Sequence, residues 1–65
     1  MPASTALESA ARCRECANAE LQRAANANSP EQRAAFPELA ARWEALAKTY
    51  DSVAKMNLAL DRRAA

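Results

Sequence analysis

The sequence predicts an all-α fold in which two amphipathic helices form an antiparallel hairpin. Three features of composition support this prediction: among 65 residues there is no glycine, 19 residues are alanine, and one Val and no Ile are present. Tight turns depend on glycine and strands favour β-branched residues, whereas alanine is the strongest helix former. The composition therefore argues against sheet-based folds and for helices throughout.

The chain is expected to form a single helical-hairpin domain over residues 1–65. Because 12 large apolar residues are available besides the alanines, one hairpin can bury only a small core. The expected elements are a first helix over residues 6–27, a loop at 28–29, a short turn over 30–35 and a second helix over 37–62.

Thr5 and Glu8 indicate where the first helix begins. They have the spacing of a capping box, in which each side chain accepts a hydrogen bond from the backbone N–H of the other residue. At 100° per residue, small and apolar side chains then gather on one face of this helix. That face consists of Leu7, Ala10, Ala17, Leu21, Ala24 and Ala25.

Arg14 falls within this apolar face. Folding the chain back at residue 29 brings Arg14 level with Glu44 of the second helix. We expect the stem of Arg14 to pack on Trp43 while the guanidinium pairs with Glu44. The alternative is that Arg14 contacts an anion or a partner protein.

The connection between the helices has the clearest local signals. Asn28 tolerates the left-handed conformation and can end the first helix where glycine would usually serve. Ser29 is an N-cap, Pro30 suits the first helical position, and Gln32 completes a second capping box. Two caps around so short a connection predict antiparallel neighbours.

The second helix has an apolar pattern of a and d positions, with a row of small residues beside it. Pro37 interrupts it, because proline beyond the first turn removes the hydrogen bond to the Arg33 carbonyl and costs roughly 3 kcal/mol. We therefore expect a kink or break near Pro37. The pattern consists of Phe36, Leu39, Trp43, Leu46, Tyr50, Val53, Asn57 and Leu60, and the small row of Ala40, Ala47 and Ala54.

Self-association is expected because the second helix is the longer one, so its last turns find no partner within the hairpin. A domain of this size rarely gains more than roughly 3–5 kcal/mol from one core. Two hairpins packed into a four-helix bundle would cover these residues, and Asn57 would fix the register. A homodimer is the first choice, with an unidentified protein partner as the alternative. The expected interface is Trp43, Leu46, Tyr50, Val53, Met56, Asn57 and Leu60.

Cys13 and Cys16 form a C-x-x-C pair, which suggests a thiol redox pair or half of a zinc site. A zinc site needs four ligands, and the chain has no histidine and no further cysteine. We therefore expect no metal and no cofactor, with a small semi-buried Cys13 and an incidental thiol at Cys16. A metal- or redox-responsive regulator remains the first alternative function.

Other function classes find little support in the sequence. With nine basic and eight acidic residues interspersed, the net charge of +1 gives no electrostatic footprint for nucleic acid, so a nucleic-acid-associated protein is only the second alternative. No set of catalytic residues is visible, so we expect no enzyme activity. No apolar run reaches the roughly 18 residues of a membrane span. Without a signal-peptide pattern at the start, a cytoplasmic location with reduced thiols is expected.

Three runs of the chain carry a resemblance. They are Ala11-Arg12-Cys13-Arg14 with Ala17, then Ser29-Pro30-Glu31-Gln32-Arg33, then Leu39-Ala40-Ala41-Arg42-Trp43-Glu44-Ala45-Leu46-Ala47. Over residues 7–50 the chain resembles a group of very short bacterial proteins, found especially in alphaproteobacteria, that are helical hairpins and mostly have no assigned function. Pro37 stands where an aliphatic residue is usual. The resemblance implies the hairpin architecture and no activity.

Overall fold

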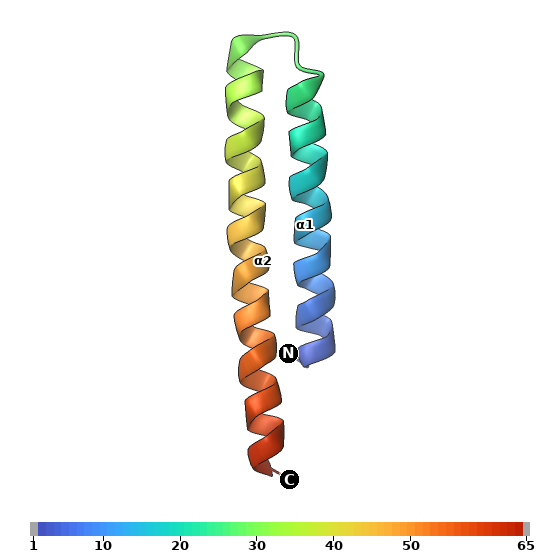
Figure 1. Ribbon diagram of the computed structural model, residues 1–65, viewed down its shortest axis with the longest axis vertical. Helices are drawn as coiled ribbons and strands as arrows, with labels where there is room; N and C mark the ends of the chain where they lie inside the picture. The colour runs from blue at the N-terminus through green and yellow to red at the C-terminus, as the bar shows by residue number, and fades with distance from the viewer. Residues whose placement is uncertain (1, 65) are drawn as a thin grey trace.

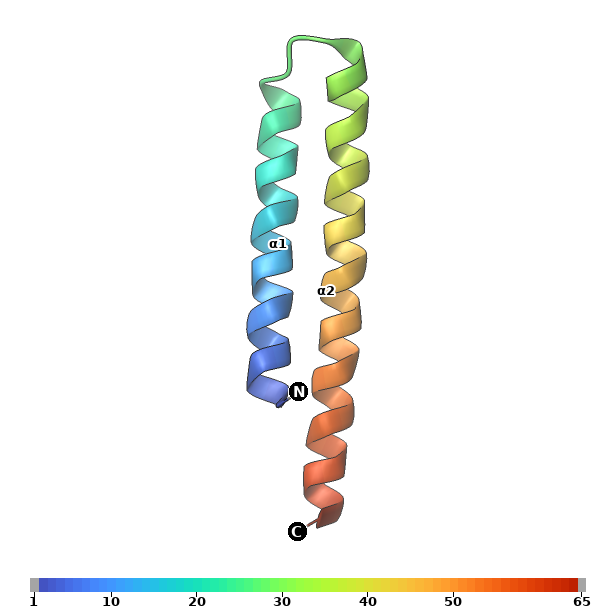
Figure 2. The same cartoon turned by 180° about the vertical axis from the view of Figure 1, so that it is seen from behind.

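The computed structural model describes residues 2–64 as two helices, α1 (Ala3–Ala25) and α2 (Pro30–Ala64), joined by a short loop. Figures 1 and 2 show the helices side by side and antiparallel, with the C-terminal end of α2 running past the start of α1. The protein measures 55 × 13 × 12 Å. The predicted all-α hairpin with a longer second helix is therefore confirmed.

The start of α2 follows the sequence signals. The Ser29 hydroxyl accepts a hydrogen bond from the Gln32 N–H at 3.2 Å, and the Ser29 carbonyl accepts one from the Arg33 N–H at 3.1 Å. Pro30 occupies the first helical position, where its missing N–H costs nothing. The predicted N-cap at Ser29 is confirmed.

The end of α1 differs from the prediction, because Asn26 and not Asn28 is the C-cap. The Asn26 side-chain amide donates to the Gln22 carbonyl at 3.1 Å, and its backbone N–H donates to the Gln22 and Arg23 carbonyls, both at 3.2 Å. These bonds satisfy terminal carbonyls without a left-handed residue. No residue in the described part of the chain has a positive φ, so the left-handed conformation predicted for Asn28 is wrong.

The start of α1 also differs. Pro2 is the N-cap, with φ −62° and ψ 150°, and its carbonyl accepts from the Ala6 N–H at 3.0 Å. The capping box predicted at Thr5 and Glu8 is wrong, because both residues lie inside a helix that begins at Ala3. Ala3, the strongest helix former, precedes Thr5, and the Pro2 carbonyl accepts the first helical hydrogen bond, so the helix begins before the expected cap.

Pro37 lies inside α2, which continues through it as one helix of 35 residues. A straight helix of this length measures about 52 Å at 1.5 Å per residue, close to the 55 Å long axis of the molecule. The predicted separate turn over residues 30–35 and the break near Pro37 are therefore wrong, and the kink stays a prediction. Pro37 and Arg33 are both exposed, so the Arg33 carbonyl that loses its helical donor lies where water can replace it.

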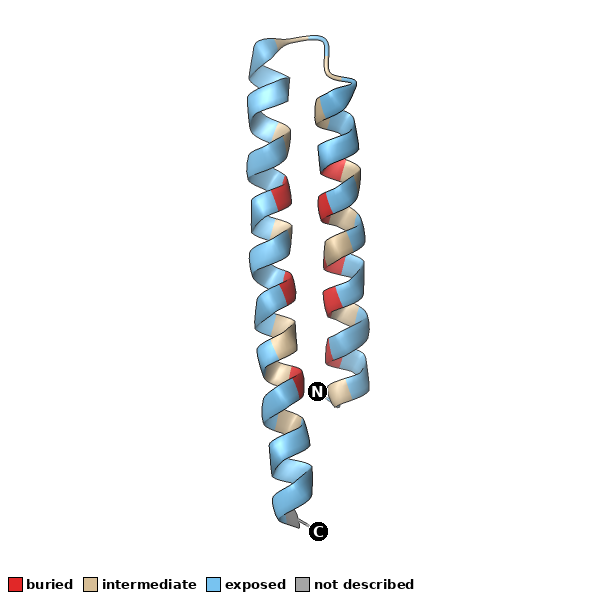
Figure 3. Cartoon of the chain, viewed as in Figure 1, coloured by how far each residue is buried: buried red, intermediate tan, exposed pale blue. Residues whose placement is uncertain are grey.

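The core between the helices consists almost entirely of small side chains. On α2 it is the alanine row, defined as Ala40, Ala47 and Ala54, which is 0 to 4% exposed. Figure 3 shows the buried residues confined to the facing sides of the two helices. Alanine at seven-residue intervals lets two helix backbones approach closely and leaves little space for larger groups. The buried residues of α1 are Ala6, Ala10, Cys13, Ala17 and Glu20.

The apolar face predicted for α1 is only partly right. Ala10 and Ala17 are buried, but Leu7 and Leu21 are 50% and 49% exposed. They lie beside the seam because closely packed alanines leave no room for a leucine between the backbones. Folding the chain back at residue 29 places Ala10 opposite the turn that contains Ala47, and these two residues do pack in one cluster.

Candidate protein-interaction surface

A row of large apolar side chains runs along α2 beside the alanine row. We call Leu39, Leu46, Val53 and Leu60 the leucine row; they repeat every seven residues and so lie on one side of the helix. Leu39, Leu46 and Leu60 are 38%, 40% and 55% exposed, and Val53 is half-buried. The row therefore remains largely open to solvent after the hairpin has formed.

The residues predicted as an interface share this side of α2. Trp43 and Tyr50 lie between the two rows, where they are half-buried and pack against the cluster around Ala47. Met56 is the most exposed large apolar side chain of the described residues, at 63%. Asn57 is half-buried. The structure thus brings Trp43, Leu46, Tyr50, Val53, Met56, Asn57 and Leu60 together along one helix, and their role in an interface stays a prediction.

A shallow hollow of about 250 Å³ opens on this surface. Leu39, Arg42, Trp43 and Leu46 line it, so all its walls come from α2. Their spacing of i, i+3, i+4 and i+7 is that of the four-residue hole that accepts a side chain from a neighbouring helix in a coiled coil. Arg42 contributes the only charge, and its stem can lie along the apolar wall while its head stays in water.

The opposite edge of the hairpin carries a charge pair. The Arg14 guanidinium donates to the Asp51 carboxylate at 2.5 Å, with the two side chains 44% and 33% exposed. This hydrogen bond is the main cause that holds the pKa of Asp51 below its ordinary value, against loss of hydration, and it raises the pKa of Arg14. Leu7 and Leu21 lie seven residues before and after Arg14. The apolar side chains at this edge are therefore separated by a charge, whereas those of the leucine row follow one another without a charge between them.

The pairing predicted for Arg14 with Glu44 is wrong. Side chains on a helix lean toward its N-terminus. In an antiparallel pair, Arg14 and Asp51 therefore lean toward each other, although their backbones are not level. Glu44, level with Arg14, leans away toward the loop, and it acts on Arg14 only as a lesser charge effect. The sequence signal that could have found Asp51 is this direction of lean, which a comparison of levels ignores.

Glu20 occupies a core position that the sequence analysis missed. It is 9% exposed and follows Ala17 along the seam. Its Oε1 accepts from the Arg23 guanidinium at 2.8 Å, while Oε2 has no hydrogen-bond partner within the described residues. The repeat of three and four residues from Ala6 through Ala10, Cys13 and Ala17 reaches Glu20 next, which is the pattern that identifies it.

Cys13 is buried at 5% exposure and Cys16 is half-buried, and both are free thiols. Cys13 packs with Ala10 and Ala47 as a small apolar side chain. Within residues 2–64, no group of three or more metal-ligating side chains comes together. Cys13 and Cys16 are the two thiols of the described part of the chain.

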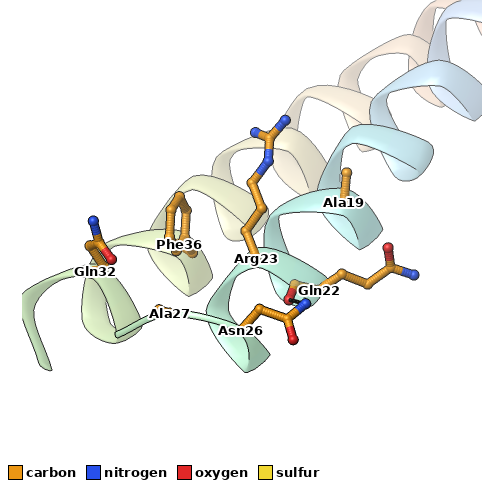
Figure 4. A pocket seen from close by; sticks show the side chains of 7 residues that line it. All are labelled: Ala19, Gln22, Arg23, Asn26, Ala27, Gln32 and Phe36. Carbon is orange, nitrogen blue, oxygen red and sulfur yellow. Dashed lines mark hydrogen bonds between the residues drawn. The ribbon is translucent and has the colours of Figure 1, made fainter. Parts of the chain in front are cut away.

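A second hollow, of about 450 Å³, lies at the loop end of the hairpin. Figure 4 shows the Phe36 ring of α2 and the extended Arg23 side chain of α1 beside it, with the loop residue Ala27 at its edge. Its other lining residues carry amides or a methyl group, and none is buried. This hollow is therefore open to water and lies beside the loop.

No protein-family model, curated protein or solved structure matches this chain. Neither helix, as far as the chain is described, combines the length and apolar character needed to cross a membrane.

Proposed function

We propose that this protein is a small non-catalytic interaction or scaffold protein that acts by self-association, with two hairpins packing into a four-helix bundle. The observation that carries the proposal is the inversion of the usual burial pattern. Among the residues whose burial the structure describes, the buried apolar ones are six alanines and Cys13, while seven large apolar side chains are 38 to 63% exposed. Large apolar residues contribute most when buried, so the hairpin by itself leaves roughly half of this apolar area without a packing partner.

The surface area of the hairpin supports the same proposal. A globular monomer of 7.0 kDa exposes roughly 4,000 Å², whereas this chain exposes 4898 Å². The excess of roughly 900 Å² is close to the roughly 800 Å² that each partner buries in a standard protein interface. A second copy, with the same elongated shape and the same exposed row, would remove this excess.

The leucine row is the surface that fits such a partner. It is continuous over three heptads, whereas the edge around Arg14 and Asp51 holds a charge pair already satisfied within the chain. Covering the exposed half of one leucine stabilises by about 1 kcal/mol. Four positions on each copy then contribute comparably to the stability of a small domain. A reducing compartment such as the cytoplasm agrees with the two free thiols.

The concentration dependence of unfolding tests this proposal. One folded dimer unfolds into two separate chains, so a higher protein concentration favours the folded dimer. The thermal midpoint of a dimer therefore rises with protein concentration, and that of a monomer does not. We expect the midpoint, followed by circular dichroism, to rise across a hundredfold concentration range. Leu46→Gln should abolish the rise, and Ala45→Gln, on the exposed side of α2, should preserve it. A midpoint independent of concentration in the unmodified chain would contradict self-association.

A further inference from the structure

We propose that two hairpins pair as a two-fold symmetric antiparallel dimer, in which Leu60 of each copy occupies the hollow over Leu39, Arg42, Trp43 and Leu46 of the other copy. This inference rests on the proposed self-association and adds the register and the side chain that fills the hollow. It follows from the lining of the hollow, the position of Leu60 and the spacing of the leucine row.

The hollow needs a side chain from another helix. Its four walls come from α2 alone, and a hole of this spacing accepts one residue that projects from a facing helix. Because α1 covers the alanine row on a different side of α2, no described part of the same chain enters the hollow. The walls are a leucine, an aromatic ring, a second leucine and the stem of Arg42, so the matching side chain is apolar.

Leu60 has the right position and chemistry. It belongs to the leucine row and is 55% exposed. It lies in the last turns of α2, where it borders a hollow together with Pro2, Ala3 and Ser4, so the start of α1 covers it only in part. A leucine is also the usual size of residue at such contacts.

The two-fold arrangement is consistent along the whole row. Placing Leu60 in the hollow of the partner sets the symmetry axis near residue 51. In that register, Val53 of one copy lies opposite the space between Leu46 and Val53 of the partner. Leu46 of one copy lies opposite the space between Val53 and Leu60 of the partner. Each extended C-terminal end of α2 then lies against the loop-side half of the other α2, so both exposed regions are covered at once.

Charge favours the antiparallel over the parallel arrangement. In the antiparallel register Asp61 comes level with Arg42 of the second copy, so unlike charges approach. In a parallel dimer Arg62 and Arg63 of both copies would lie side by side at the same end, together with two helix C-termini. The difference selects the antiparallel pair.

Trp43 reports directly on the proposed contact, because it is the only tryptophan of the chain. Within one chain Leu60 lies 17 residues away, about 25 Å along the helix at 1.5 Å per residue. Leu60→Ala can therefore expose Trp43 only through the partner. We expect Leu60→Ala to raise the acrylamide quenching constant of Trp43 at least about twofold at dimer concentrations. Leu58→Ala, also on the extended end and 48% exposed, should leave it unchanged; equal quenching in all three proteins would overturn the proposal.

Disulfide cross-linking tests the register independently. In a Cys13→Ala, Cys16→Ala background that retains the helical circular dichroism, Val53→Cys places two thiols about 5 Å apart along the axis, and Leu39→Cys places them about 37 Å apart. Val53→Cys should form at least tenfold more covalent dimer than Leu39→Cys, which should match the exposed control Ala45→Cys. Equal cross-linking at both row positions would indicate a parallel dimer and overturn this inference alone. A monomer in sedimentation would overturn self-association as well.

Discussion

The two rows of α2 differ in the size of their side chains and in how far they are buried, although both repeat every seven residues. The alanine row is 0 to 4% exposed against α1, whereas in its neighbour, the leucine row, the three leucines are 38 to 55% exposed. Small side chains let two helix backbones come close, and the close approach excludes larger residues from the seam. The most apolar row of an alanine-rich hairpin therefore need not be its internal core.

A large residue in the alanine row should disturb the packing of the two helices most. Ala47 is fully buried, and Ala47→Leu adds three carbons where no space exists. We expect the free energy of unfolding to fall by about 3 kcal/mol or more, since overpacking must separate the helices. Urea denaturation followed by circular dichroism measures it. Ala45→Leu, on the exposed side, should change stability by less than about 0.5 kcal/mol, and equal losses in the two variants would contradict close alanine packing.

Pro37 belongs to neither row. It tests how much the exposed side of α2 is destabilised by the loss of one helical hydrogen bond. Proline inside a helix is about 3 kcal/mol less favourable than alanine. We expect Pro37→Ala to raise the free energy of unfolding by about 2 to 3 kcal/mol, because the Arg33 carbonyl regains its donor. The thermal midpoint should rise at every protein concentration. No rise would mean that water already compensates the Arg33 carbonyl in full.

Leu46 tests the other row. At 40% exposure it contributes part of its area within the hairpin, so Leu46→Ala should act mainly on association. We expect a loss of about 2 kcal/mol, which raises the dimer dissociation constant about 30-fold. Fluorescence of Trp43 on dilution provides the measurement. Leu21→Ala, at 49% exposure on the opposite edge, is the matched control, and an equal effect of both would place the interface elsewhere.

The smallest expected effect belongs to the charged edge. The folded pKa of Asp51 lies below its unfolded value, so its contribution is present above about pH 4 and is lost as the pH falls through the lower folded pKa. Asp51→Asn should therefore lower the thermal midpoint slightly at pH 7 and leave it equal to that of the unmodified protein near pH 2. Glu15→Gln, at an exposed position of α1, provides the control. A constant difference at both pH values would exclude the ion pair as its cause.

Much of the fold could be predicted from the sequence because local signals decide it. Ser29 and Pro30 start α2 through one hydroxyl and one missing donor, and the absence of glycine favours long helices. Pro37 was misjudged because its cost depends on exposure, and exposure depends on the packing that the sequence does not show. Because Arg33 and Pro37 are both exposed, water can replace the donor that the Arg33 carbonyl loses.

The interaction surface could be predicted less completely. The residues of the expected interface do share one side of α2, because heptad spacing alone places them there. The partner of Arg14 was missed because contact depends on the lean of each side chain and not on level alone. Glu20 was missed because ranking by polarity excludes a carboxylate from the core, although its seam position and Arg23 make it tolerable.

Sedimentation equilibrium of the unmodified chain, across a hundredfold concentration range with reductant, tests most directly whether the leucine row is covered by a second copy. The proposed dimer predicts twice the chain mass of 7.0 kDa, with the same result whether or not zinc is added. A mass of one chain at every concentration would contradict the bundle. Assembly only with zinc would also contradict it and would indicate that the copies are joined through Cys13 and Cys16.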